Sequence, residues 1–187
     1  MTDTPARATT VRHLFTGMAD DTGPRAKPLA NTLLRCRRQA AMTAALKVHR
    51  LSAGPFLFTH AVVPIMKRRQ SGKIVNLASI AGRGLSESSS SAYAAAKGGI
   101  IAFTRKLAFE LGPYGVTINA IAPSLTLTER IRPHWDKRSQ EAQATEIART
   151  PLRRVAEAAD QAKVICFLAS SDAEFVTGVT IDVTGGN

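Results

Sequence analysis

Cysteine and aromatic residues are scarce in this sequence of 187 residues, and a long apolar run is missing altogether. The two cysteines, Cys36 and Cys166, cannot build a disulfide framework and lack the spacing of metal ligands. No apolar stretch is long enough to cross a bilayer, and the first residues lack the apolar core of a signal peptide. These absences predict a cytoplasmic protein with no metal site and no membrane association.

Acidic residues are also few, with 14 Asp and Glu against 25 Lys and Arg, so the net charge is +11. Such an excess attracts phosphate groups and raises the possibility of nucleic-acid binding. However, the arginines are not interleaved with aromatic residues, and no helix-turn-helix or zinc-finger spacing is present. We therefore expect no nucleic-acid partner.

The sequence changes character near residue 50. Before that point hydrophobic periodicity is poor and no strand is evident, although residues 29–51 are rich in good helix formers and predict a helix. We interpret residues 1–53 as an atypical basic segment and residues 54–187 as the body of a globular domain. The composition fits this interpretation, since 44% of residues are hydrophobic and 21% are charged.

Helical and strand patterns alternate after residue 50. Each short apolar run is typical of a buried parallel strand, and each is preceded by a segment with helical periodicity. This order predicts an α/β fold, a Rossmann-like doubly wound parallel sheet with right-handed crossovers. The expected strands cover residues 74–78, 116–121 and 179–183, and the expected helices cover residues 56–69, 92–111, 140–148 and 156–169.

Tyr93 and Lys97 stand four positions apart in the strongest predicted helix, so both side chains lie on one helical face. A neighbouring ammonium group stabilises a phenolate, which makes the tyrosine suitable as a proton donor and acceptor. The alternative is a pair of amphipathic residues at a helix edge, and the two residues alone do not decide between these readings.

Ser79 follows the predicted strand 74–78, and Pro123 follows the predicted strand 116–121. Ligand sites in parallel sheets lie at the carboxyl ends of the strands, so both positions are expected to face one crevice. A serine hydroxyl there can donate a hydrogen bond to a substrate oxygen as negative charge develops on it. Alternatively, Ser79 only caps a turn.

With these positions, the sequence resembles the short-chain dehydrogenase/reductase family, and most closely its members similar to 3-oxoacyl-[acyl-carrier-protein] reductase. The resemblance covers residues 54–187 in the order and spacing of the family. It rests on Gly-Pro-Phe-Leu-Phe at 54–58, Gly-Lys-Ile-Val-Asn-Leu-Ala-Ser at 72–79, Tyr-Ala-Ala-Ala-Lys at 93–97, Val-Thr-Ile-Asn-Ala-Ile-Ala-Pro at 116–123, and the segment 175–186.

The resemblance implies a role for each matching residue. Tyr93 is the implied acid/base, Lys97 assists it and binds the nicotinamide ribose, and Ser79 holds the substrate oxygen. The implied cofactor-binding residues are Tyr93, Lys97, Pro123, Ser124, Thr126 and Thr128, and the cofactor is NADP or NAD. Asn76 is implied to tie its strand to neighbouring elements.

The activity implied by the resemblance is hydride transfer between the nicotinamide and a carbonyl or secondary alcohol of a small molecule. The family also implies a homo-oligomer, either a dimer or a tetramer, because its members pair through helices that correspond here to residues 56–69 and 92–111.

Three departures from the family pattern accompany the resemblance. The glycine-rich turn that approaches the cofactor pyrophosphate is absent, and the nearest candidate, residues 16–23, has unsuitably spaced glycines and two aspartates. The helix asparagine expected just before Gly54 is missing from residues 49–53. Ser124 replaces the usual glycine after Pro123.

The first 50 residues are also too few to form the remaining strands and crossover helices of the family, since each strand–helix–strand unit needs about 30 residues. We therefore expect a truncated sheet whose N-terminal strands are missing or replaced, with strand 74–78 at an open edge. Whether the chain is an enzyme stays undecided at this point. The alternative is an inactive fragment that lacks dinucleotide binding and retains only the oligomerising helices.

Overall fold

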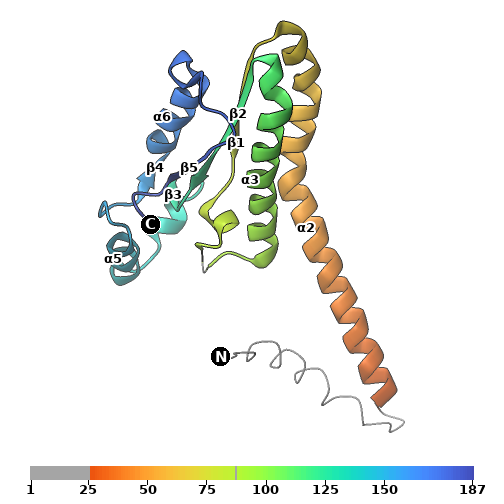
Figure 1. Cartoon of the computed structure of the whole chain (residues 1–187). Coiled ribbons are helices and arrows are strands. Elements are labelled where there is room, and N and C mark those ends of the chain that lie inside the picture. Colours follow the sequence, from red (N-terminus) through yellow and green to blue (C-terminus); the bar gives the residue numbers. More distant parts are fainter. Residues whose placement is uncertain (1–25, 87) are drawn as a thin grey trace, which may run out of the picture. The chain divides into compact units, whose positions relative to one another are not determined.

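The structure is a computed structural model that describes residues 26–86 and 88–187. The chain divides into two units between Ala44 and Ala45. In the first unit the described residues are helical and belong to α2 (Ala26–Arg69). The second unit contains the rest of α2 and all the other described elements (Figure 1).

Helix α2 corrects one prediction, because the two helices expected at residues 29–51 and 56–69 are continuous. Pro55 lies inside the helix and removes one backbone hydrogen bond. A residue before proline normally avoids the helical conformation because its Cβ meets the proline ring, but Gly54 has no Cβ. The Gly-Pro pair therefore fits within the helix. The expected boundary between the basic segment 1–53 and the globular domain 54–187 therefore falls inside α2.

Three parallel strands form the main sheet, in the order β1 (Gly72–Leu77), β2 (Val116–Pro123) and β5 (Thr180–Val183). The register pairs Leu77 with Ile121 and Ala120 with Thr180. All three predicted strands are thus present in one sheet, and the predicted Rossmann-like α/β class is confirmed. Because the strands are parallel, their carboxyl ends lie at the same edge.

Helices cover both faces of this sheet (Figure 1). On one face α3 (Ser91–Leu111) packs through Ile100 against Ala120 of β2. On the other face α6 (Ala158–Ala169) packs through Leu168 against Ile121 of the same strand. Neighbouring strand residues point to opposite faces, so β2 is buried on both sides, which explains its continuous apolar sequence.

The remaining elements are short and surround the carboxyl ends of the strands or connect the main elements. The predicted helix 140–148 is confirmed, whereas the helix predicted from residue 156 begins at Ala158, because residues 156 and 157 pair with a second short strand. No helix in the described ranges is both long enough and apolar enough to cross a membrane. The short elements are η1 (Ile80–Arg83), η2 (Gly112–Tyr114), β3 (Thr126–Leu127), α4 (Arg132–Asp136), α5 (Gln140–Arg149), β4 (Ala156–Glu157) and η3 (Ser171–Ala173).

Two buried asparagines fix the elements around β1 and β2. Asn76 of β1 donates from Nδ2 to Oγ1 of Thr104 on α3 at 2.9 Å. Asn119 of β2 donates to the Val176 carbonyl at 2.8 Å and accepts from the Val179 amide at 3.2 Å. A buried amide without such partners costs about 1–3 kcal/mol. Asn76 therefore positions α3, and Asn119 positions the segment that leads into β5.

Gly82 allows η1 to lie directly against α3. A Cβ atom at Gly82 would be 2.6 Å from the backbone nitrogen of Gly98 and from the carbonyl carbon of Lys97. Backbone atoms cannot move aside as a flexible side chain can, so only glycine fits this contact. The contact sets the distance between η1, which follows β1, and the part of α3 that carries Tyr93 and Lys97.

The outer edge of β1 has no neighbouring strand among the described residues. The amide of Ala78 bonds to the Ile121 carbonyl at 2.8 Å, and by the alternation of a parallel ladder the polar groups of Leu77 and Val75 face the open side. An apolar groove of about 410 Å³ follows this edge. Its lining residues are Gly54, Pro55, Phe58, Thr59, Val62, Ile74, Val75, Asn76 and Leu77.

We predict that Gly82→Ala disrupts the contact between η1 and α3 and lowers the midpoint of urea unfolding. The expected loss is on the order of 1–3 kcal/mol, because backbone must shift to admit the methyl group. Gly99→Ala is the matched control, since a Cβ there meets nothing within 4 Å and alanine favours the helix by about 1 kcal/mol. Equal stability of the two variants would contradict this account of Gly82.

We also expect the whole chain to self-associate through the open edge of β1 as its concentration rises. Phe58 is 77% exposed at this edge, so Phe58→Lys should weaken the association. Phe175→Lys, at a fully exposed phenylalanine elsewhere, is the control and should leave it unchanged. Sedimentation velocity over a hundredfold concentration range measures the effect. A chain that stays monomeric and unfolds in one sharp thermal transition would show that the prediction is wrong.

Candidate active site

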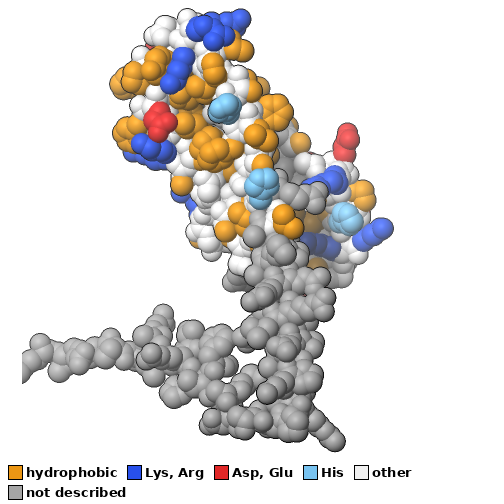
Figure 2. All heavy atoms as spheres, turned by 90° about the vertical axis from the view of Figure 1, so that its right-hand side faces the viewer, with side chains coloured by type: hydrophobic (Ala, Val, Ile, Leu, Met, Phe, Trp, Pro, Cys, Tyr) orange, Lys and Arg blue, Asp and Glu red, His pale blue; other side chains and the backbone are white. Residues whose placement is uncertain are grey.

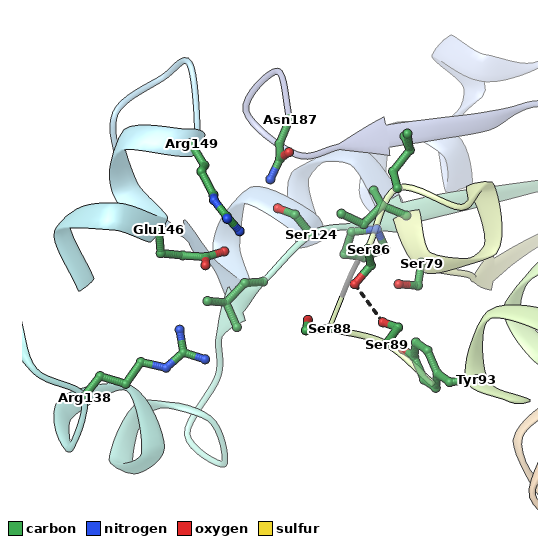
Figure 3. Close-up of a pocket in the computed structure, with 14 residues that line it drawn as sticks. Ser79, Ser86, Ser88, Ser89, Tyr93, Ser124, Arg138, Glu146, Arg149 and Asn187 are labelled. Carbon is green, nitrogen blue, oxygen red and sulfur yellow. Dashed lines mark hydrogen bonds between the residues drawn. The ribbon is translucent and has the colours of Figure 1, made fainter. Parts of the chain in front are cut away.

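A cavity of about 810 Å³ opens at the carboxyl ends of β1 and β2, and we call it the strand-end cavity (Figure 3). Its wall is made by the segments that follow β1, β2 and β5, by the first turn of α3, and by α5 with the segment before it. The lining residues are Ser79, Ile80, Leu85, Ser86, Ser88, Ser89, Tyr93, Pro123, Ser124, Leu125, Arg138, Glu146, Arg149 and Asn187.

Ser79 stands two residues beyond the end of β1 in extended backbone and caps η1. Its Oγ accepts a hydrogen bond from the Ala81 amide at 3.2 Å. The two readings of Ser79 are therefore compatible, because the residue caps a turn and also lines the strand-end cavity. An oxygen that accepts from a backbone amide still has its own proton to donate to a bound molecule.

Tyr93 belongs to the first turn of α3, and the local sequence fixes its position. Ser90 is the N-cap of the helix, and its Oγ accepts from the Tyr93 amide at 3.3 Å. The close contact at Gly82 then holds this helix beside η1. As a result the Tyr93 side chain lines the same cavity as Ser79, although 14 positions separate them in the sequence.

Lys97 lies one helical turn after Tyr93, and its Nζ is 5.8 Å from the centre of the Tyr93 ring. The ammonium donates a hydrogen bond of 2.7 Å to the backbone carbonyl of Leu77, which faces the open edge of β1. Partial burial lowers the pKa of Lys97 below its ordinary value. Sequence reasoning missed the carbonyl of Leu77 as a partner of the lysine, because no residue type marks a backbone acceptor.

The expected cofactor-binding residues after β2 occupy different places. Pro123 and Ser124 line the strand-end cavity. Thr126 turns its hydroxyl to the Ser124 carbonyl at 3.1 Å and also accepts from the Gln161 side chain at 3.2 Å. Thr128 is exposed, does not line the cavity, and accepts through its carbonyl from the amides of the next turn.

The far wall of the cavity is formed by residues that the sequence analysis did not single out. Figure 3 shows Arg138, Glu146 and Arg149 grouped across the cavity from Ser79 and Tyr93. They come from α5 and the segment before it, where the sequence has no recognisable motif. Only the three-dimensional fold brings these charged side chains opposite the tyrosine.

Other candidate features of the sequence fall elsewhere. The glycine pair within residues 16–23, the nearest match to a pyrophosphate-binding turn, lies outside the described residues. Residues 49–53, where the family asparagine is missing, belong to α2. In the described ranges no group of three or more His, Cys, Asp or Glu side chains has metal-binding geometry.

These groups are suited to proton transfer at an oxygen atom. A phenol and a serine hydroxyl line one cavity, and an ammonium group lies close behind the phenol. The phenol can donate or accept a proton, and the serine can donate a hydrogen bond to an oxygen on which charge develops. The cavity thus brings together a phenol that could act as an acid/base and a serine hydroxyl that could bind an oxygen atom.

A family model described as enoyl-(acyl carrier protein) reductase matches residues 25–187, which includes all of α2. Among curated proteins, the BbsD subunit of (2S)-[(R)-hydroxy(phenyl)methyl]succinyl-CoA dehydrogenase from Thauera aromatica is 40% identical over 133 residues, covering 71% of this chain and 51% of that protein.

The 3-oxoacyl-[acyl-carrier-protein] reductase FabG of Thermotoga maritima is 37% identical and covers 71% of this chain and 52% of its own length. Among solved structures, a 3-oxoacyl-[acyl-carrier protein] reductase from Brucella melitensis with bound NAD is 39% identical with a TM-score of 0.63, over 71% of this chain and 47% of that chain. The chain therefore spans about half the length of the relatives it matches.

The family model covers far more than half of the sequence, and the relatives share well over a third of their residues with it in the matched part. The parallel sheet and the placement of its helices agree with a solved member of the group. The chain belongs to the short-chain dehydrogenase/reductase family, and within it resembles the 3-oxoacyl-[acyl-carrier-protein] reductases.

Proposed function

We propose that the chain acts as an NAD(P)-dependent oxidoreductase on a carbonyl or secondary alcohol of a small molecule, with Tyr93 as the acid/base. The observation that carries the proposal is the convergence of Tyr93 and Ser79 on one cavity, with the Lys97 ammonium 5.8 Å from the tyrosine ring. The family supports the oxidoreductase class. The identity of the substrate is left to experiment.

The residues near the tyrosine fit the nicotinamide end of a dinucleotide. Lys97 supplies an ammonium donor for ribose hydroxyls, Ser124 supplies a hydroxyl, and Pro123 supplies an apolar surface for a planar ring. We extend the same role to Thr126 and Thr128, which follow directly. When bound, the cofactor donates or accepts the hydride, and the protein supplies position and the proton.

The proposed proton transfer uses groups of this chain. In the reducing direction, Ser79 donates a hydrogen bond to the substrate oxygen and stabilises the charge that develops there. The Tyr93 hydroxyl then gives its proton to that oxygen, and the Lys97 ammonium stabilises the phenolate that is left. In the oxidising direction the phenolate accepts the proton of the alcohol.

A second candidate function is that of a catalytically inactive chain that retains only the helices for assembly. Two observations favour it. The Lys97 ammonium donates a hydrogen bond to the Leu77 carbonyl, and Lys97 does not line the strand-end cavity. Hydrophobic side chains also gather over the face formed by α2 and α3 (Figure 2), where Leu57 and Phe109 are 70% and 69% exposed. We propose a homo-oligomer, a dimer or tetramer, as the state in which this face is covered.

Cofactor binding separates the two candidates. We expect NADH or NADPH, titrated separately into the whole chain, to bind saturably, as followed by nicotinamide fluorescence and by the emission of Trp135, the only tryptophan. The two titrations together also distinguish NAD from NADP. If neither nucleotide binds at millimolar concentration, the oxidoreductase proposal fails and the inactive chain is favoured.

Tyr93→Phe removes the proton but retains the ring, so we expect it to lower turnover by at least about 100-fold, the usual contribution of general acid–base catalysis. Cofactor affinity should stay nearly unchanged. Tyr114→Phe is the control, because Tyr114 is the other tyrosine of the chain and lies on η2, away from the cavity. The assay is the absorbance of reduced nicotinamide with acetoacetyl-CoA as substrate, and equal turnover of both variants would refute the role of Tyr93.

A further inference from the structure

We infer that the far wall of the strand-end cavity binds an anionic group of the substrate, a phosphate or a carboxylate, through Arg149 and Arg138. This inference rests on the proposed function, because it assumes that the reacting carbonyl lies at Ser79 and Tyr93. It adds a substrate class, namely carbonyl compounds whose anionic group is held at the opposite end of the cavity.

The positions of the two arginines in the cavity support this inference. The cavity has two chemically different ends, with hydroxyl groups of Ser79 and Tyr93 on one side and guanidinium groups on the other (Figure 3). Its volume of about 810 Å³ lies at the upper part of the range for small-molecule sites. A small neutral ketone at Tyr93 fills only one end, and a longer substrate reaches both.

The lack of carboxylate partners for these two arginines within the described residues also supports it. Arg132 and Arg154, from the same part of the chain, each form an ion pair of 2.6 Å, with Glu157 and Asp160 respectively. Within the described ranges, neither Arg138 nor Arg149 takes part in an ion pair. A guanidinium that lines a cavity without a carboxylate partner offers its planar donors to a phosphate or carboxylate ligand.

The Arg138 side chain is also held in place by an aromatic neighbour. Its guanidinium carbon lies 5.6 Å from the centre of the Trp135 ring, and Trp135 of α4 is buried against Leu127 and Val155. This contact restricts the side chain and reduces the entropy that a ligand must overcome. It also links the proposed anion site to a fluorescent group that reports on its occupancy.

Glu146 is the third charged group of this wall, and Figure 3 shows it beside the two arginines. It forms no ion pair within the described ranges, so it lowers the positive potential of the wall without neutralising either arginine directly. The charged side chains of the lining therefore have a net charge of +1, from two arginines and one glutamate. Removing the glutamate charge should strengthen anion binding.

Three probes test the inference on the whole chain. Acetoacetyl-CoA carries phosphates, 3-oxoadipate carries carboxylates, and the N-acetylcysteamine thioester of acetoacetate has the same reacting ketone as the first probe with no charge. Dissociation constants are measured by calorimetry and by Trp135 emission, without need for turnover. We expect at least one anionic probe to bind about tenfold more tightly than the neutral thioester, as is typical of a charge-assisted hydrogen bond.

Charge variants then assign the effect to residues. Arg149→Gln and Arg138→Gln should each weaken the tighter anionic probe by about tenfold and leave the neutral thioester unchanged, whereas Glu146→Gln should strengthen the anionic probe. Arg69→Gln is the matched control, because Arg69 is exposed at the end of α2 and lines no part of the cavity. It removes one charge of the same sign and should have no effect.

The possible outcomes separate this inference from the proposed function. Whichever anionic probe binds more tightly identifies the anion as phosphate or carboxylate. If the neutral thioester binds as tightly as both anions, or if the Arg149 and Arg69 variants behave alike, the anion site is refuted while the carbonyl site at Tyr93 stands. If none of the three probes binds, both are refuted.

Discussion

The parallel pairing of β1 with β2 is the constraint on which the rest of the site depends. It places the ends of both strands at one edge, and the bond from the Ala78 amide to the Ile121 carbonyl continues the ladder to the last residue before Ser79. Ser79 and Pro123 therefore open onto the same space. A one-residue slip of either strand would turn Asn76 or Asn119 to the opposite face, away from its hydrogen-bond partner, so these buried amides hold the register.

The second requirement is that α3 lies close enough to this edge for its first turn to reach the cavity. Gly82 and Gly98 make this possible, because their lack of side chains lets the backbone of η1 touch the backbone of α3. Asn76 and Thr104 fix the same helix farther along. The geometry of the proposed active site thus depends on residues that do not line the strand-end cavity, and these residues belong to the range 54–187 that the resemblance covers.

The sequence predicted the sheet well and the site in part, and the reasons differ. The strands were evident because buried parallel strands need unbroken apolar runs, and α3 was evident from its helical periodicity. The extent of α2 was not, because a Gly-Pro pair usually ends a helix, whereas α2 continues through both Pro55 and Pro64. Arg138 and Arg149 were missed because α5 has no motif and its contribution to the cavity arises only from tertiary packing.

The open edge of β1 is in contact with a residue of the proposed active site. The carbonyl of Leu77 faces that edge, and the group that satisfies it is the ammonium of Lys97, the residue on which the proposed reactivity of Tyr93 depends. A strand docked on β1 would supply backbone donors along the same row of acceptors. The Leu77 carbonyl would then accept hydrogen bonds from both the lysine and that strand, and its bond to the Lys97 ammonium would weaken. Lys97 thus contacts the open edge of β1 through its ammonium and at the same time lies 5.8 Å from the ring of the proposed acid/base.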